Sequence, residues 1–180
     1  MIFIILGVLV LLALGIVASM LYVVRQQTVV IIERFGKYYT TASSGIHIRL
    51  PFGIDKIAAR IQLRLLQSEI VVETKTKDNV FVTLNVATQY RVSEQNVIDA
   101  YYKLMRPEAQ IKSYIEDALR SSVPKLTLDE LFEKKDEIAL EVQHQVAEEM
   151  SPYGYVIVKT LITKVEPDAE VKQSMNEINA

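Results

Sequence analysis

The sequence predicts an α+β fold that follows a membrane-spanning helix at the N-terminus. Charged residues make up 23% of the 180-residue chain, yet residues 1–24 contain none. Residues 69–92 alternate between apolar and polar side chains around a polar turn, which is typical of strands with one buried face. Residues 133–150 instead repeat their apolar side chains about every four positions, as an amphipathic helix does. Strands followed by helices indicate an antiparallel sheet covered by packed helices.

The first segment, Ile2–Val24, is a long run without charge or proline. A helix of this length spans roughly 35 Å, which exceeds the ~30 Å hydrocarbon core of a bilayer. Tyr22 is then expected at the level of the lipid headgroups, and Arg25 ends the span. A cleaved signal peptide is disfavoured because the apolar run is too long and lacks a basic start, and core helices are rarely apolar all round. We therefore predict a single-pass anchor at residues 1–24.

Residues 25–92 are predicted to be the strand-rich part of the domain. Extended segments are expected at residues 27–32, 46–50 and 56–66, where β-branched or alternating apolar side chains lie between turns. The hairpin within residues 69–92 is the clearest element. Its turn contains Asp and Asn, which tolerate a positive φ.

Residues 93–166 are predicted to be the helix-rich part, with one returning strand. Two helices are expected at residues 94–104 and 108–122, each followed by a proline. Thr127 and Glu130 have capping-box spacing and precede the long amphipathic helix. Apolar residues after the next Pro-Tyr-Gly break predict a strand that ends near Val165.

Residues 167–180 are predicted to start a helix that leaves the domain. Val171, Met175 and Ile178 have a 4–3 spacing, which is the beginning of a coiled-coil heptad. No helix stop signal occurs before Ala180, so we expect the coiled-coil helix to continue in the natural polypeptide.

Composition argues against several classes of function. The net charge is −2 without an arginine-rich stripe, so nucleic acid is not an expected partner. The absence of cysteine excludes a thiol nucleophile and a zinc–thiolate site. A Ser–His–Asp site can be assembled on paper from Ser43 or Ser44, His47 and Asp55, but nothing in the sequence fixes their geometry. We therefore predict a protein that is not an enzyme and that has no cofactor or metal.

Several segments carry a family resemblance in their order along the chain. They are ERFGK at residues 33–37, GIHIRLPF at 45–52, ETKTKDNVFV at 73–82, SVPKLTLD at 122–129, residues 153–167, and MNEINA at 175–180. Together they resemble the SPFH or Band 7 superfamily of stomatins, prohibitins and flotillins, over roughly residues 27–180. The likeness is strongest to the plant hypersensitive-induced-reaction branch. That branch is usually acylated and lacks a spanning helix, and stomatins have a proline-kinked hairpin, so the plain apolar span favours a prokaryotic or organellar single-pass member.

The resemblance implies a membrane scaffold that assembles many copies into rings or cages. Such a scaffold organises membrane microdomains or sequesters membrane proteins and proteases. The alternative is a regulatory subunit that acts on a membrane protease or channel by direct contact. Expected partners are lipids, further copies of the chain, and a membrane-bound AAA protease or a small membrane protein.

Two sets of residues are predicted to make these contacts. Tyr22, Phe52 and Ile54 are expected at the membrane, since a turn otherwise exposes apolar Phe52 and Ile54 to water; the open alternative is that these two pack into the domain's own core. Contacts between copies are expected at Ile138, Val142 and Val146 of the long helix, and at Val171, Met175 and Ile178 of the last one.

Basic residues also predict the location of the domain. Arg25, Arg34 and Lys37 follow the span, whereas only the terminal amine precedes it. By the positive-inside rule, the soluble domain is expected in the cytoplasm, at the cell membrane.

Overall fold

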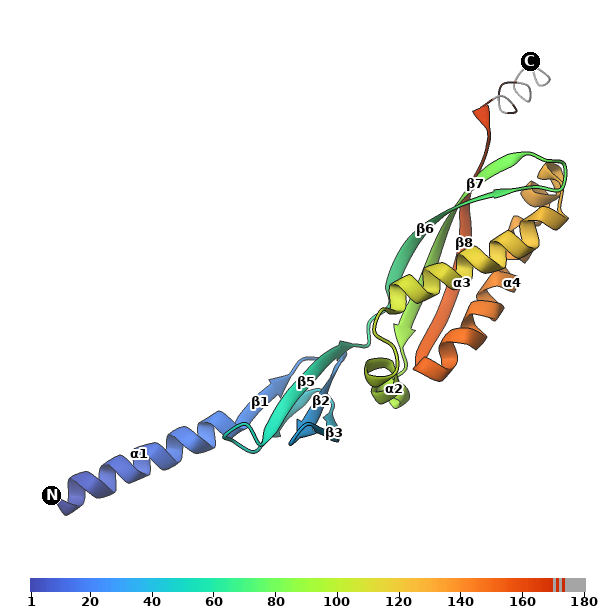
Figure 1. The fold of residues 1–180 in the computed structure, drawn as a ribbon. Coiled ribbons are helices and arrows are strands. Elements are labelled where there is room, and N and C mark those ends of the chain that lie inside the picture. The colour runs from blue at the N-terminus through green and yellow to red at the C-terminus, as the bar shows by residue number, and fades with distance from the viewer. Residues whose placement is uncertain (170, 172, 174–180) are drawn as a thin grey trace. The chain divides into compact units, whose positions relative to one another are not determined.

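The computed structural model describes residues 1–169, 171 and 173, and the chain folds as two compact units (Figure 1). Unit 1 is Met1–Arg64 and unit 2 is Leu65–Ala180. The division therefore differs from the predicted boundary between residues 92 and 93. The reason is that both strands of the central hairpin belong to the same sheet as the returning strand.

Unit 1 begins with helix α1, Ile2–Met20, none of whose residues is buried. Among the described residues, α1 is the one helix that is long and apolar enough to cross a membrane. Strand β1, Leu21–Val24, follows α1 directly. The predicted helix through Val24 is thus four residues too long, because Tyr22 and Val24 are buried in the core of unit 1 as alternate residues of a strand.

The rest of unit 1 contains two small antiparallel sheets. Strand β1 pairs with β4, Gly45–Ile48, in a two-stranded ribbon. The other sheet has the order β3-β2-β5 and consists of β2 (Thr28–Arg34), β3 (Lys37–Ala42) and β5 (Asp55–Gln62). Strand β3 was not among the predicted strands, since most of its side chains are polar or exposed. The two sheets share one core, which is made of Tyr22, Val24, Val30, Ile32 and Ala42.

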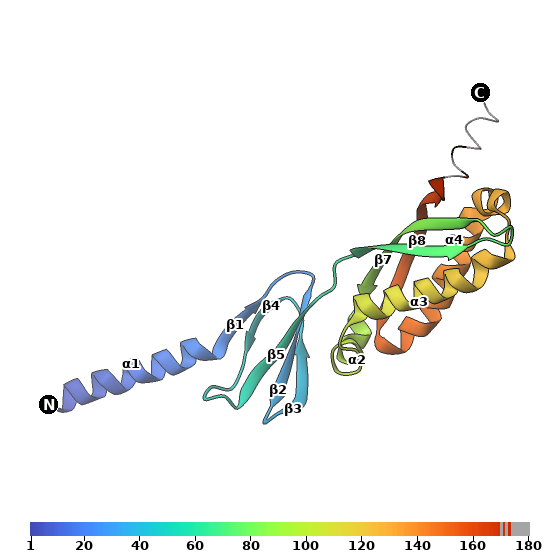
Figure 2. The same ribbon diagram turned by 45° about the horizontal axis from the view of Figure 1, so that its top comes forward.

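Unit 2 contains a three-stranded antiparallel sheet with helices on one face (Figures 1 and 2). The strand order is β6-β7-β8, with β6 at Leu66–Lys75, β7 at Phe81–Val92 and β8 at Tyr155–Pro167. The α-helices are α2 (Val97–Tyr102), α3 (Pro107–Ser122) and α4 (Leu128–Met150), with short 3₁₀ turns at Glu94–Asn96, Val123–Lys125 and Ser151–Tyr153. Helix α3 contacts β6 and helix α4 contacts β8, so the two helices cover the buried face.

The turn of the β6–β7 hairpin also holds the start of α4. The predicted capping box is confirmed, because the Thr127 side chain accepts the Glu130 N–H and Glu130 accepts the Thr127 N–H. The Asp78 carboxylate accepts the Leu128 N–H at 3.2 Å. The Thr76 hydroxyl donates to Asp78 as well and lowers the pKa of that carboxyl. Local turn chemistry thus joins two segments that are 50 residues apart.

A bulge in β8 depends on one glutamine of α4. Gln89 pairs with Lys159 and Tyr90 with Ile157, which leaves Val158 as an extra residue. The Gln143 side-chain oxygen accepts the Thr160 N–H at 3.1 Å, and its nitrogen donates to the Val158 carbonyl at 3.3 Å. One side chain therefore bonds the carbonyl of the extra residue and an N–H two residues farther along the strand.

We predict that Gln143→Leu lowers the free energy of unfolding by about 1 kcal/mol, because the bulge loses two hydrogen-bond partners. Urea unfolding followed by circular dichroism measures the change. Gln145→Leu is the matched control, since Gln145 lies on the same helix and is exposed. Equal destabilisation by the two substitutions would contradict this role of Gln143.

Candidate membrane-contact site

The junction between α1 and β1 joins the apolar helix directly to the folded part of unit 1. The Leu21 N–H donates to the Ala18 carbonyl and closes the helix, and Leu21 then pairs with Ile48 in the ribbon. The Arg49 N–H donates to the Met20 carbonyl at 2.9 Å. The segment that follows β4 is therefore held against the last turn of α1.

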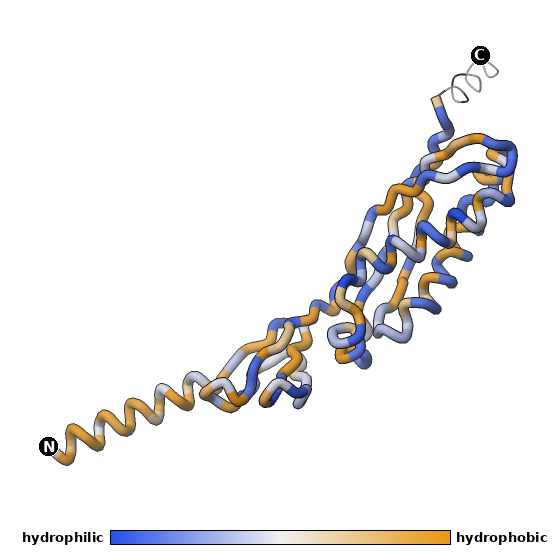
Figure 3. Tube along the Cα trace, in the orientation of Figure 1, coloured by the Kyte–Doolittle hydropathy of each residue, from blue (hydrophilic) through white to orange (hydrophobic). Residues whose placement is uncertain are grey.

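One face of the β1–β4 ribbon is apolar and exposed. It consists of Leu21 and Val23 from β1 and of their partners Ile48 and Ile46 from β4, and we call these four residues the ribbon face. They are 50%, 63%, 68% and 73% exposed, respectively. Figure 3 shows that α1, which leads directly into this ribbon, is hydrophobic along nearly its whole length. An apolar surface that adjoins a potential span marks a contact with lipid or with another protein.

The opposite face of the ribbon belongs to the core. Tyr22 is 9% exposed, and the centroid of its ring lies 5.7 Å from that of His47. Burial raises the pKa of Tyr22. The prediction that Tyr22 contacts lipid headgroups is therefore wrong, because strand alternation turns its side chain into unit 1.

The loop from Arg49 to Ile54 presents a further exposed apolar side chain, in addition to those of the ribbon face. Phe52 is 83% exposed and has a φ of +61°, a conformation that costs a non-glycine residue about 1 kcal/mol or more. Ile54 is half-buried; its N–H donates to the Pro51 carbonyl, and its carbonyl accepts the Phe35 N–H. The loop thus directs Phe52 outward and ties Ile54 to the domain. Contact of these two residues with the membrane stays a prediction.

A buried carboxylate holds the base of this loop. Asp55 forms a two-point ion pair with Arg34, with N–O distances of 2.7 and 3.0 Å. It also accepts the Leu50 N–H at 2.8 Å. The Arg34 guanidinium is the main cause of a lowered pKa at Asp55, and it stacks 3.6 Å over the ring of Tyr39. These bonds fix both ends of the segment that carries Phe52.

These contacts also concern the Ser–His–Asp site that was considered from the sequence, with Ser43 or Ser44, His47 and Asp55. His47 Nε2 lies 2.7 Å from the backbone carbonyl oxygen of Ser43. Asp55 is bound by Arg34 and by the Leu50 amide. The imidazole and the carboxylate therefore each have a structural partner other than a serine hydroxyl.

Three of the residues predicted to join copies are in the core of unit 2. Ile138, Val142 and Val146 lie on the buried face of α4 and are at most 4% exposed. The prediction that they contact a second copy is wrong, because their apolar stripe packs within its own unit. Val171 is half-buried, whereas Met175 and Ile178 lie outside the described residues.

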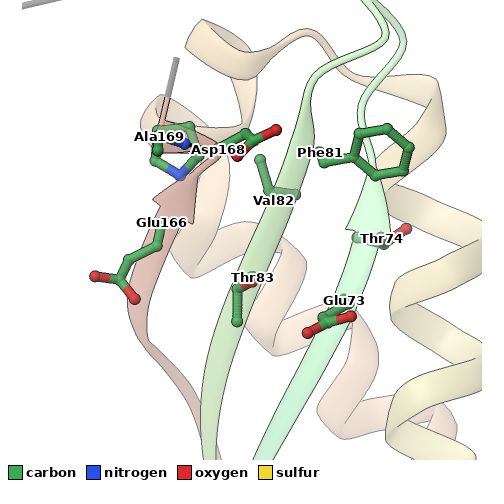
Figure 4. Close-up of a pocket in the computed structure, with 9 residues that line it drawn as sticks. Glu73, Thr74, Phe81, Val82, Thr83, Glu166, Asp168 and Ala169 are labelled. Atoms are coloured by element: carbon green, nitrogen blue, oxygen red, sulfur yellow. Dashed lines mark hydrogen bonds between the residues drawn. The ribbon is translucent and has the colours of Figure 1, made fainter. Parts of the chain in front are cut away.

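A separate hollow of about 510 Å³ lies at one end of the unit 2 sheet (Figure 4). Glu73, Glu166 and Asp168 line it together with Phe81 and Thr83. Within the described part of the chain, no three His, Asp or Glu side chains are grouped closely enough to hold a metal ion. The hollow is an acidic surface without a recognisable reactive group.

We predict that Asp55→Asn destabilises β4 and β5 by about 1.5–3 kcal/mol at pH 7, the range for a hydrogen bond to a charged group. Because the folded pKa of Asp55 is lowered, its contribution is present above the unfolded value of about 3.9 and is lost as the pH falls through the folded pKa. Hydrogen exchange of the β4 and β5 amides measures the effect. The difference from wild type should shrink below about pH 4, and Asp117→Asn, at an exposed carboxylate, should change little. A difference that is constant down to pH 3 would refute the ion-pair explanation.

Comparison with known proteins identifies the family to which the chain belongs. The sequence model of the SPFH domain / Band 7 family matches residues 22–180. The chain is 40% identical to "Hypersensitive-induced response protein 4" of Arabidopsis thaliana over 157 residues, which cover 87% of this chain and 54% of that protein. It is 26% identical to a stomatin homolog of Pyrococcus horikoshii over 165 residues, which cover 88% of this chain and 58% of that protein.

An uncharacterized protein of Mycobacterium tuberculosis is 25% identical over 177 residues, which cover 96% of this chain and 45% of that protein. The chain thus spans about half the length of the curated relatives that it matches. The family match begins at Tyr22, the first core residue of β1, and includes both units. The motif-based resemblance is confirmed: the chain belongs to the SPFH domain / Band 7 family.

Proposed function

We propose that this chain is a membrane-anchored scaffold subunit whose copies assemble laterally into rings or cages and so organise the surrounding membrane. SPFH proteins are in general membrane-associated and self-associating, and the family is generally non-enzymatic. The observation that carries the proposal is the apolar surface that runs from α1 onto the ribbon face without an intervening linker.

The short span and the ribbon face act together. Helix α1 has 19 residues, so it is roughly 28 Å long and just matches the hydrocarbon core. The ribbon face then lies at the interface, where burial of each half-exposed side chain contributes on the order of 1 kcal/mol. A lone helix leaves its domain free to rotate, whereas this second contact restrains it. The subunit thereby presents a fixed side to its neighbours.

The distribution of charge favours an orientation in which the soluble units lie on the cytoplasmic side of the membrane. Unit 1 carries seven Lys and Arg against two carboxylates, a net charge of +5, whereas unit 2 has a net charge of −7. A basic segment next to a span is attracted to the anionic cytoplasmic leaflet and obeys the positive-inside rule. We therefore place the soluble units in the cytoplasm, at the cell membrane.

We assign lateral assembly to the helix that the sequence predicts at residues 167–180. Val171, Met175 and Ile178 provide a heptad seed, which is too short to be stable in isolation. Neighbouring copies supply the missing contacts. Many linked anchors then hold one membrane patch much more tightly than a single anchor does.

The membrane contact can be tested with a fluorescent probe, because the chain contains no tryptophan. We predict that Ile48→Trp in lipid vesicles shows blue-shifted emission that brominated lipids quench. Leu140→Trp is the control, since Leu140 is 53% exposed on the outer face of α4 in unit 2; its emission should be quenched by aqueous iodide instead. Equal iodide quenching at both positions would contradict contact between the ribbon face and the membrane.

Assembly can be tested by single-particle mass measurement of the full chain in mild detergent. We predict large particles for wild type and small ones for Val171→Asp combined with Met175→Asp, with the strand signal in circular dichroism retained. Ser113→Asp combined with Gln145→Asp adds the same charge at exposed positions and should leave particle size unchanged. Large particles in the first variant would show that other surfaces join the copies. A small wild-type complex would favour a regulatory subunit that acts by direct contact.

A further inference from the structure

We propose that unit 1 binds the phosphate group of an anionic phospholipid in a pocket at the end of α1, between Arg49 and Lys56. The inference rests on the proposed membrane anchorage and adds a ligand to it. The pocket has a volume of about 390 Å³, within the usual range for ligand pockets. Its lining includes Ser19, Arg49, Leu50, Phe52, Asp55 and Lys56.

The residues that line the pocket indicate its position relative to the membrane. Ser19 lies in the last turn of α1, and the Arg49 backbone is hydrogen-bonded to Met20, the last residue of the helix. When α1 spans a bilayer, these residues lie where hydrocarbon meets headgroups. The molecules that surround the pocket at that depth are lipid headgroups and water.

The charges in the pocket favour an anion. Asp55 is the carboxylate that lines it, and that charge is already compensated by the two-point pair with Arg34. Among the described residues, the ion pairs found do not involve Arg49. Lys56 lies directly opposite Glu33 in the β2–β5 register. Arg49 is half-buried and Lys56 is exposed. Arg49 is therefore the main candidate to bind a phosphate, to which its guanidinium can donate two parallel hydrogen bonds, and Lys56 adds a second positive charge to the lining.

The rim of the pocket favours a lipid over a free anion. Phe52 and Leu50 are exposed apolar side chains on the same loop as Arg49. The left-handed backbone of Phe52 holds its ring outward at an energetic cost, which contact with an acyl chain offsets. The pocket thus places cations beside an apolar rim, which matches a molecule with a phosphate joined to hydrocarbon. The net charge of +5 on unit 1 attracts anionic lipids over a longer range.

Arg49 has a competing structural role that the test must separate. The C-terminus of a helix carries partial negative charge, and a nearby cation stabilises it. If that were the whole role of Arg49, its removal would lower stability in lipid-free detergent and would leave lipid selectivity unchanged.

The test measures lipid retention by the full chain in native mass spectrometry, with phosphatidylglycerol or phosphatidylcholine added to the detergent. Wild type is expected to retain phosphatidylglycerol preferentially. Arg49→Gln combined with Lys56→Gln is expected to reduce that preference roughly 30-fold. Arg25→Gln combined with Lys37→Gln is the matched control, because it removes the same charge from unit 1 at residues that do not line the pocket. This control should retain the wild-type preference.

Three outcomes would overturn the proposal. They are an equal loss of preference in both double variants, displacement of phosphatidylglycerol by millimolar inorganic phosphate, and a pocket variant that loses only thermal stability in lipid-free detergent. Carbonate extraction of membranes separates this proposal from the proposed function. Wild type that stays in the membrane without lipid preference contradicts the pocket alone, whereas wild type that is extracted contradicts the anchorage.

Discussion

The covalent continuity between α1 and β1 is the constraint on which the proposed membrane contact depends. No linker separates Met20, the last residue of the helix, from Leu21, the first residue of the strand. The Arg49–Met20 hydrogen bond then ties the loop after β4 to the same point. The ribbon face, the Phe52 loop and the pocket are therefore all connected to the last turn of α1.

The change from helix to strand also divides one apolar run between two environments. In a helix, Leu21–Val24 would expose all four side chains to lipid. In a strand, Leu21 and Val23 face outward, whereas Tyr22 and Val24 complete a core with Val30. The segment that begins the folded domain is thus also part of the surface that we propose to contact the membrane, and under that proposal the orientation of unit 1 is coupled to its folding.

The elements that were predicted correctly carry local signals. The β6–β7 hairpin has a largely alternating pattern and a turn with Asn79 at positive φ, and the start of α4 has a complete capping box. By contrast, the end of α1 lies inside a continuous apolar run, where no cap or charge marks it. The division at residue 64 depends on pairing between β7 and β8, which are more than 60 residues apart in sequence. Periodicity alone does not reveal such a partner.

The residues of the candidate membrane-contact site could also be predicted only in part from the sequence. The exposed turn that contains Phe52 could be located from its motif, because an apolar residue beside a glycine turn is visible in sequence. The ribbon face could not, since Leu21 and Ile48 become neighbours only through pairing. Arg49 and Lys56, the cations of the proposed pocket, were not predicted either, although the excess of basic residues in the first 64 positions is a signal that favours an anionic partner. The apolar stripe of α4 predicted burial correctly but not the partner against which it is buried.

Burial of that stripe restricts how copies can associate. With Ile138, Val142 and Val146 inside unit 2, the surface that α4 offers to a neighbour is its outer face. Helix α4 carries eight carboxylates against two lysines, and exposed Leu140 lies among them. Two copies that met through identical outer faces would bring these carboxylates together, which is unfavourable at close range. Under the proposed function, α4 therefore keeps identical outer faces apart, and the contacts between copies are assigned to the helix predicted at residues 167–180.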